Sequence, residues 1–329
     1  MFTLACAAAS SAHAADESIV PEELRKDVLP AKPKAGAFNN TLSIGSTGSY
    51  GHSSSVVGAA DGSTVAIGVV IDGLSEWVSG AFECANTLKI QHTQTRTPQL
   101  PVFFKSADFA EIVSTSIYRL QSVPWFGPYA RFRINTQLFG SYVLKATDYE
   151  IKQTRLDGTS TATKLAAQTR YDLASGFNPL VFAETVGAFA NPIEQKWMTI
   201  KAKLGVGAQH VRSTSGFAVA SDDTKAGKME IKEIQEASQM GGEAEVALAG
   251  DVTEGVAWKA KANVFLPAYS TAGKKTGFDA MTSDLSFALG IKLAKWLSVD
   301  YTVTARRVPL VLDDWQIQNG IILTAGFKL

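Results

Sequence analysis

The sequence lacks the features that define several large protein classes. Its two cysteines, Cys6 and Cys84, cannot form a disulfide framework. Thirty-one basic and 31 acidic side chains give a formal net charge of zero, whereas nucleic-acid-binding proteins usually carry a basic excess. The four histidines are scattered without metal-ligand spacing. After the first stretch, no apolar run reaches the roughly 18 residues that a transmembrane helix needs.

The N-terminal stretch "MFTLACAAASSAHAADES" predicts export. Residues 1–14 read as the end of a signal peptide, with an A-x-A cleavage site at Ala12-His13-Ala14. The positive n-region that usually begins a signal peptide is missing, which is the pattern expected of a truncated or misplaced start. Lipidation at Cys6 is the alternative, and it also predicts export. Residues 15–38 are charged and contain three prolines, which predicts an extended periplasmic segment.

From residue 39 to 329 the chain alternates in polarity with a period of two, which predicts β-strands. In 256–266, Val256, Trp258 and Ala260 alternate with Lys259 and Lys261. The same pattern recurs in 197–208, 284–293 and 297–306. The segment 108–121 also fits helical spacing, but its Val, Ser, Thr, Ile and Tyr content favours a strand.

Such alternation is typical either of a soluble sandwich or of a membrane barrel. Strands of about nine to eleven residues favour the barrel. Short connections near 72–80, 122–128, 191–195, 251–254 and 294–296 alternate with longer ones near 51–63, 91–107, 156–177, 209–241, 268–283 and 308–313. We therefore expect an all-β, closed antiparallel transmembrane barrel of about twelve strands, with ten to fourteen as the range. The count assumes that 129–155 is one overlong strand and that 228–238 is a loop or a short helix.

Two further patterns agree with a membrane barrel. The six tryptophans lie near expected strand ends, as an aromatic girdle requires. Strand parity also places twelve charged side chains in the lumen: Arg131, Arg133, Lys201, Lys203, Lys259, Lys261, Lys292, Arg306, Glu243, Glu245, Asp284 and Asp300. Eight are basic and four are acidic, an excess of four. These charges either form an anion-favouring passage or pair across a filled barrel.

The C-terminal segment "WQIQNGIILTAGFKL" resembles the closing strand of bacterial outer-membrane β-barrel proteins. The resemblance implies a barrel-closing signal at Ile321, Leu323, Phe327 and Leu329, read by the barrel-assembly machinery. The last residue of such strands is usually Phe or Trp, and here it is Leu329. Segments 105–144 and 176–189 also resemble uncharacterised outer-membrane barrel domains of unknown function, a likeness that implies fold and location without an activity.

Chemical motifs are scarce. There is no Walker A loop, CxxC, HExxH or acidic calcium loop, so we expect neither a metal nor a cofactor. His210 precedes Ser213 and Ser215, and His52 precedes three serines, but a triad is defined by geometry and not by such proximity. We therefore expect no catalytic residues and a protein that is not an enzyme.

The expected function is a passive, porin-like or uptake channel of the bacterial outer membrane with a mildly basic lumen. The first alternative is a structural barrel that docks envelope partners through segment 15–38 or loop 209–241. The second is a rim hydrolase that uses His210. Outer-membrane lipid is an expected partner in each case, and nucleic acid is not.

Overall fold

The computed structural model describes residues 36, 38–53, 62–195, 197–223, 226–272, 276–294, 297–309 and 312–328. The expected signal peptide (1–14), nearly all of the expected periplasmic segment (15–38) and Leu329 lie outside these residues. Within them the chain forms β-strands and one 3₁₀ turn, η1 (Gly277–Ala280), so the all-β prediction is confirmed. No helix among the described residues is long and apolar enough to cross a bilayer.

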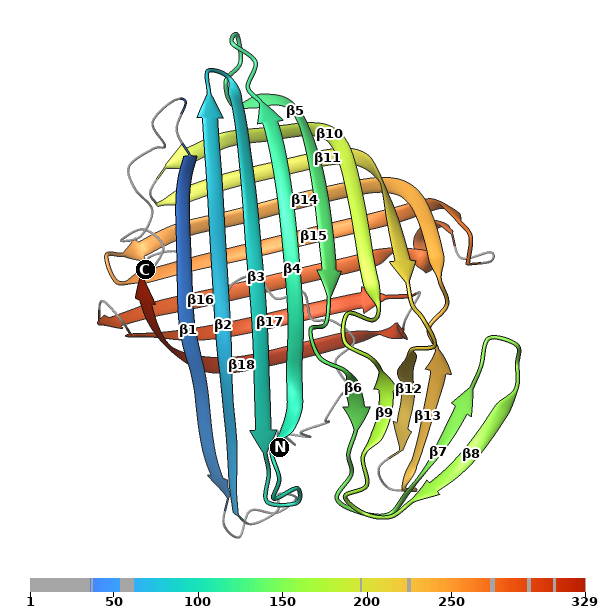
Figure 1. Cartoon of the computed structure of the whole chain (residues 1–329). Coiled ribbons are helices and arrows are strands. Elements are labelled where there is room, and N and C mark those ends of the chain that lie inside the picture. Colours follow the sequence, from blue (N-terminus) through green and yellow to red (C-terminus); the bar gives the residue numbers. More distant parts are fainter. Residues whose placement is uncertain are drawn as a thin grey trace.

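The main sheet is antiparallel throughout and closes on itself (Figure 1). Its order is β1-β18-β17-β16-β15-β14-β11-β10-β5-β4-β3-β2, and β1 pairs with β18 from Ser43↔Lys328 to Gly48↔Leu323. Its strands are β1 (Phe38–Ser53), β2 (Gly62–Ser79), β3 (Phe82–Arg96), β4 (Phe104–Tyr118), β5 (Phe126–Thr136), β10 (Leu180–Gln195), β11 (Met198–Arg212), β14 (Ala237–Thr253), β15 (Val256–Ser270), β16 (Thr282–Ala294), β17 (Leu297–Val308) and β18 (Leu312–Lys328).

The two faces of this sheet differ in polarity because successive side chains of a strand point to opposite sides. On β11, Leu204 and Val206 face outward and are 68% and 65% exposed. On β5, Phe132 is exposed while the neighbouring Arg131 is buried. An apolar outer surface around a polar interior inverts the arrangement of a soluble protein and is typical of a membrane barrel.

Aromatic side chains lie at the strand ends, as the sequence predicts. Trp125 and Trp197 are exposed beside the short connections β4–β5 and β10–β11. Trp315 is exposed at the other end, at the start of β18. Trp77 stacks on Phe38 beside the β2–β3 turn. Trp296 lies outside the described residues.

Short and long connections alternate as expected, although their limits differ from the predicted ones. Strand β2 runs to Ser79 through the expected turn at 72–80, and the chain reverses at Gly80 and Ala81. Gly80 has a φ of +59°, a left-handed value that glycine adopts without strain. The ambiguous segment 108–121 is a strand as far as Tyr118, so the strand interpretation was right.

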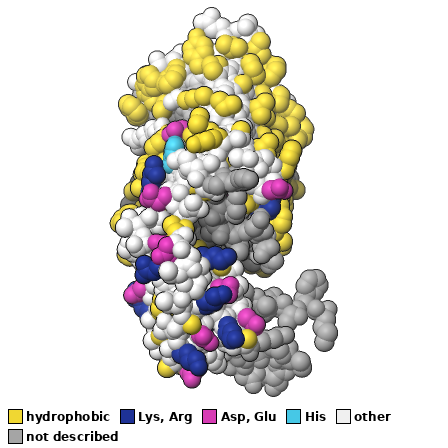
Figure 2. All heavy atoms as spheres, turned by 90° about the vertical axis from the view of Figure 1, so that its right-hand side faces the viewer, with side chains coloured by type: hydrophobic (Ala, Val, Ile, Leu, Met, Phe, Trp, Pro, Cys, Tyr) yellow, Lys and Arg dark blue, Asp and Glu magenta, His cyan; other side chains and the backbone are white. Residues whose placement is uncertain are grey.

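A second, smaller sheet projects from the barrel on the side of the long connections (Figure 1). Its order is β12-β13-β7-β8, and a two-stranded sheet, β6-β9, accompanies it. These strands are β6 (Ser141–Val143), β7 (Tyr149–Thr154), β8 (Ser160–Leu165), β9 (Tyr171–Ala174), β12 (Phe217–Asp223) and β13 (Lys228–Glu233). We call the two sheets together the projecting domain. Figure 2 shows charged side chains concentrated on it and hydrophobic side chains over the barrel.

The projecting domain corrects two predictions. Residues 129–155 are not one strand, because β5 ends at Thr136 and the chain continues into β6 and β7. Residues 228–238 are neither a loop nor a helix, because 228–233 form β13 and β14 starts at Ala237. In both cases the chain leaves the barrel to bury a separate apolar cluster, which includes Ile151 and Ile231.

This small core generates a prediction about stability. Ile231 is 0% exposed, so Ile231→Ala removes contacts inside the projecting domain and should destabilise it by about 2–5 kcal/mol. Limited proteolysis should then cleave 141–174 or 217–233 before the barrel. The matched variant Ile231→Val should lose only about 0.5–1.5 kcal/mol. Equal protease resistance of Ile231→Ala and the wild type would contradict this packing.

A charged cluster inside the barrel

Arg131 is the centre of an ionic cluster on the inner face of the barrel. It projects from β5, and its guanidinium reaches two carboxylates on β14. Nη1 donates a hydrogen bond to Glu245 at 2.6 Å, and Nη2 donates one to Glu243. The three side chains are only 5–7% exposed. Removing such charges from water is costly unless they are paired, and this arrangement pairs them.

Three further polar groups complete the hydrogen bonding of the two carboxylates. Lys203 on β11 donates to Glu245 at 2.8 Å. Asn263 on β15 donates to Glu243 at 2.8 Å, and Thr185 on β10 donates to the other oxygen of Glu243. Lys261 lies 3.6 Å from Glu245. The cluster therefore holds Arg131, Lys203 and Lys261 against Glu243 and Glu245, an excess of one positive charge.

Register and side-chain size explain how β5 can reach β14. Lys203 is directly opposite Glu245, and Glu245 is directly opposite Asn263, so these groups meet across neighbouring strands. Arg131 must instead cross β10 and β11. The inward position between it and Glu243 is Gly205, where an added Cβ would lie 2.5 Å from the Val186 carbonyl oxygen and 2.9 Å from the Tyr129 hydroxyl. Glycine is what leaves room for this contact.

The other lysines and arginines expected in the lumen are placed less centrally. Arg306 lies 3.9 Å from Asp284. Asp300 is buried and accepts a hydrogen bond from Ser298 at 3.1 Å. Arg133, Lys259 and Lys292 are partly buried, whereas Lys201 is exposed on the face that it shares with Lys203.

Strand parity alone did not identify the uncharged members of the cluster. Thr185 and Asn263 lie at inward positions, but only the register shows that they meet the carboxylates. On β4, Glu111 is buried at an inward position opposite Asn135, and Asp108, which has the opposite parity, is buried as well. Asp108 accepts hydrogen bonds from Lys105 at 3.0 Å and from the Phe139 amide at 2.7 Å.

The backbone of the predicted closing strand, β18, pairs with a strand on each side. Leu323 pairs with Gly48 on one side and with Val299 on the other, and Phe327 pairs with Ile44. Ile321 is exposed on the outside of β18. Leu329 lies outside the described residues.

The polar neighbours of His210 in the structure lie far from it in the sequence. Strand β11 continues past it to Arg212. Its Nδ1 lies 2.9 Å from the Ser238 hydroxyl, and its Nε2 lies 3.5 Å from Glu184. Ser213 instead donates to Asn178 at 2.9 Å. Among the described residues, no group of three or more His, Cys, Asp or Glu side chains could hold a metal ion.

No protein-family model matches the chain, and no curated protein matches it. Among solved structures, an outer membrane channel (COG4313) from Pseudomonas putida F1 is 8% identical, with a TM-score of 0.41 and coverage of 91% of this chain and 99% of that one. The translocator domain of the autotransporter NalP from Neisseria meningitidis is 9% identical, with a TM-score of 0.37 and 92% coverage of both chains. OmpT, an outer membrane protein of Vibrio cholerae, is 8% identical, with a TM-score of 0.33 and coverage of 91% and 99%.

Likenesses at these identities and TM-scores carry no information on activity. The location follows from the chain itself. A closed sheet satisfies its own backbone hydrogen bonds, and an apolar outer face around a polar interior suits a lipid environment. The chain is a β-barrel protein of the bacterial outer membrane.

The cluster yields a prediction for Arg131→Ala. The substitution leaves Glu243 and Glu245 buried without their guanidinium partner, and breaking such a buried pair costs about 3–5 kcal/mol. Urea unfolding of the refolded barrel in detergent micelles measures the loss. The double variant Arg131→Met, Glu243→Gln should recover part of it, because Glu243 then carries no charge while Glu245 keeps Lys203 and Lys261 as partners. Arg155→Ala, at an exposed site, should change stability by less than about 0.5 kcal/mol; an equal loss in both single variants would contradict the assignment.

Proposed function

We propose that the chain forms a closed barrel of about twelve strands that gives small solutes a narrow passage through the outer membrane. The Arg131 cluster is the observation that carries this proposal. Charged and hydrogen-bonding groups occupy the interior of a barrel whose outer face is apolar, and charged rings of this kind set ion selectivity in pores.

The burial and pairing of the cluster support a narrow passage. Glu243, Glu245 and Arg131 are below one-tenth exposed, and each contacts side chains from other strands. A wide water-filled pore would leave such groups solvated. The cluster therefore supports a constricted passage and small solutes over a general porin. The charge balance of three cations to two anions in the cluster favours anions.

Ion selectivity is tested with Lys201, which shares its face with Lys203 and is exposed. Lys201→Glu should lower the anion-to-cation permeability ratio by at least about twofold, because a unit charge at about 4 Å is worth ~1 kcal/mol even in water. Reversal potentials in planar bilayers under a salt gradient measure the ratio. Lys232→Glu makes the same charge change on an exposed site of the projecting domain and should leave the ratio unchanged. A refolded wild-type barrel that gives no conductance would exclude the passage.

A second candidate, a barrel that docks envelope partners, is favoured by the projecting domain. Two connections far apart in sequence combine there around a common core, outside the barrel. We expect the C-terminal strand to be read by the barrel-assembly machinery under either candidate.

Copurification from native membranes tests the docking candidate. A partner that the wild-type chain retains should be lost with Ile231→Asp, which places a charge in the core of the projecting domain. The barrel itself should still fold, as shown by its heat-modifiable mobility on gels. Retention of the same partner by both chains, or of none by either, would contradict docking through this domain.

A further inference from the structure

Glu184, His210 and Ser238 form a line of polar contacts across three adjacent strands. Ser238 on β14 and His210 on β11 are directly opposite each other, and Glu184 lies on the next strand, β10. The Ser238 hydroxyl is 2.9 Å from Nδ1 of His210, and the Glu184 carboxylate is 3.5 Å from Nε2. A nucleophile, a base and a carboxylate in this order are the arrangement of a Ser–His–acid triad, which is recognised by geometry.

These three side chains face outward, toward lipid. His210 has the same parity as Leu204 and Val206, Ser238 the same as Met240, and Glu184 the same as Val186. The four apolar residues and Glu184 are exposed, and His210 and Ser238, which contact each other, are partly buried. The triad therefore does not belong to the lumen cluster.

The triad also lies at the edge of the apolar surface. His210 lies two residues before the end of β11, and Ser238 is the second residue of β14. Both therefore lie at the end of the barrel from which the projecting domain extends. Just beyond them, Arg212 at the end of β11 and Glu236, immediately before β14, form an exposed ion pair at 3.7 Å. An apolar outer band that ends at exposed charges is the pattern expected where the hydrocarbon core of a membrane gives way to the headgroup region.

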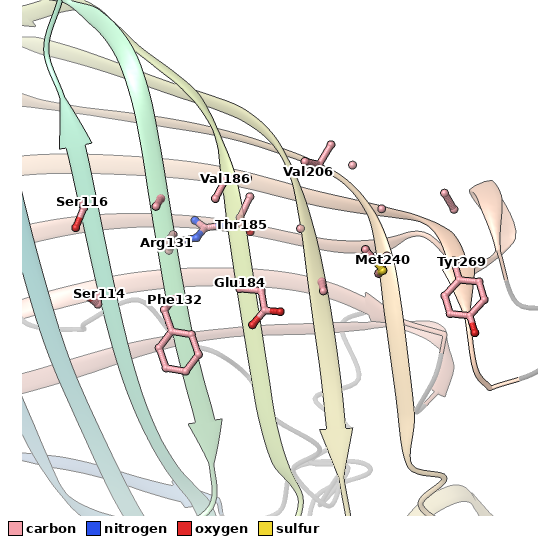
Figure 3. A pocket seen from close by; sticks show the side chains of 16 residues that line it. Ser114, Ser116, Arg131, Phe132, Glu184, Thr185, Val186, Val206, Met240 and Tyr269 are labelled. Carbon is pink, nitrogen blue, oxygen red and sulfur yellow. The ribbon is translucent and has the colours of Figure 1, made fainter.

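An apolar groove with a volume of about 870 Å³ adjoins the triad on the same outer face. Glu184 lines it, together with Val206, Met240 and Tyr269 (Figure 3). Gly242 and Ala208 also line it, and larger side chains at these positions would occupy its space. Because the groove opens on the lipid-facing surface of a barrel, an acyl chain of a membrane lipid is the occupant that this surface meets. A volume of this size is within the range of lipid and small-molecule sites.

We propose that Ser238, His210 and Glu184 hydrolyse a long-chain acyl ester of a membrane lipid whose chain lies in this groove. The proposal relies on the outer-membrane location and is independent of conductance through the lumen. The Arg212–Glu236 ion pair beside the site offers charged contacts of both signs to a lipid headgroup.

The chemical step balances with water as the second substrate. The Ser238 oxygen attacks the ester carbonyl carbon while Nδ1 of His210 accepts the hydroxyl proton, and Glu184 stabilises the proton on Nε2. The bond to the lipid alcohol breaks, and the alcohol leaves with the proton from His210. Water, deprotonated by His210, then attacks the acyl-serine, which releases a fatty acid and regenerates the Ser238 hydroxyl.

Refolded full-length protein tests the proposal with two kinds of readout. A long-chain alkyl fluorophosphonate should label Ser238, as located by peptide mass spectrometry. Fatty-acid release from phosphatidylethanolamine vesicles and from lipopolysaccharide, measured separately, distinguishes the two lipid sources of an acyl ester. Ser238→Ala should abolish labelling, and His210→Gln should lower release by about a hundredfold or more. Glu184→Gln should lower release with the label still on Ser238, because it positions the imidazole.

Matched controls separate chemistry from folding. Ser213→Ala should keep full activity, since that hydroxyl bonds to Asn178 instead of His210. An added Cβ at Gly242 meets only one atom, at 4.0 Å, so Gly242→Leu should fold, fill the groove and reduce release of long acyl chains, with a short water-soluble ester still cleaved. Gly48→Leu, at an equally open and exposed glycine on β1, should leave release unchanged.

The outcomes that overturn the proposal are distinct from failure of the passage. Wild-type protein with heat-modifiable mobility that neither labels at Ser238 nor releases fatty acid from either lipid would overturn it, whatever its conductance. Release that persists in Ser238→Ala would overturn it as well. Absence of conductance with intact lipid hydrolysis would exclude the passage and leave the hydrolytic site standing.

Discussion

The closure of the sheet between β1 and β18 is the constraint on which the rest of the structure depends. In a bilayer no water can satisfy an exposed strand edge, so each strand must have a partner on both sides. The pairing from Ser43↔Lys328 to Gly48↔Leu323 provides the last one. Once the sheet is closed it has an inside and an outside, and the period-two pattern of every strand then decides which side chains meet lipid and which meet the interior.

Inside, the same constraint forces charges to satisfy one another. Arg131, Glu243 and Glu245 are almost inaccessible, and their pairing depends on a glycine at 205 that leaves the space between two strands open. A cluster of this kind adds little net stability compared with apolar packing, because the desolvation of the ions offsets their attraction. Net stabilisation alone therefore does not account for the cluster, and the proposed passage would give the polar interior a role.

The sequence was a good guide to whatever depends on local periodicity. Alternation along 197–208 correctly indicated a spanning strand, with Lys203 on the inner face and Leu204 and Val206 on the outer face. It was a poor guide to features that depend on contacts between distant segments. Strand β13 shows its own alternation in Met229 and Ile231, but its parallel partner β7 lies in another connection, so nothing local indicates the projecting domain. Ser238 was missed as the partner of His210 for the same reason, since the register and not the nearby Ser213 sets that contact.

One register accounts for both candidate sites. On β11 and β14, Lys203 is opposite Glu245, and seven residues further along His210 is opposite Ser238. Seven is odd, so the first pair faces the interior and the second faces lipid. Inside, a charged pair is the expected solution for a polar lumen. On the outer face, His210, Ser238 and Glu184 lie where the apolar surface gives way to the exposed Arg212–Glu236 ion pair, a boundary at which polar side chains are tolerated. Tolerance alone does not require that a serine, a histidine and a glutamate contact one another in this order, and the proposed hydrolysis gives those contacts a role.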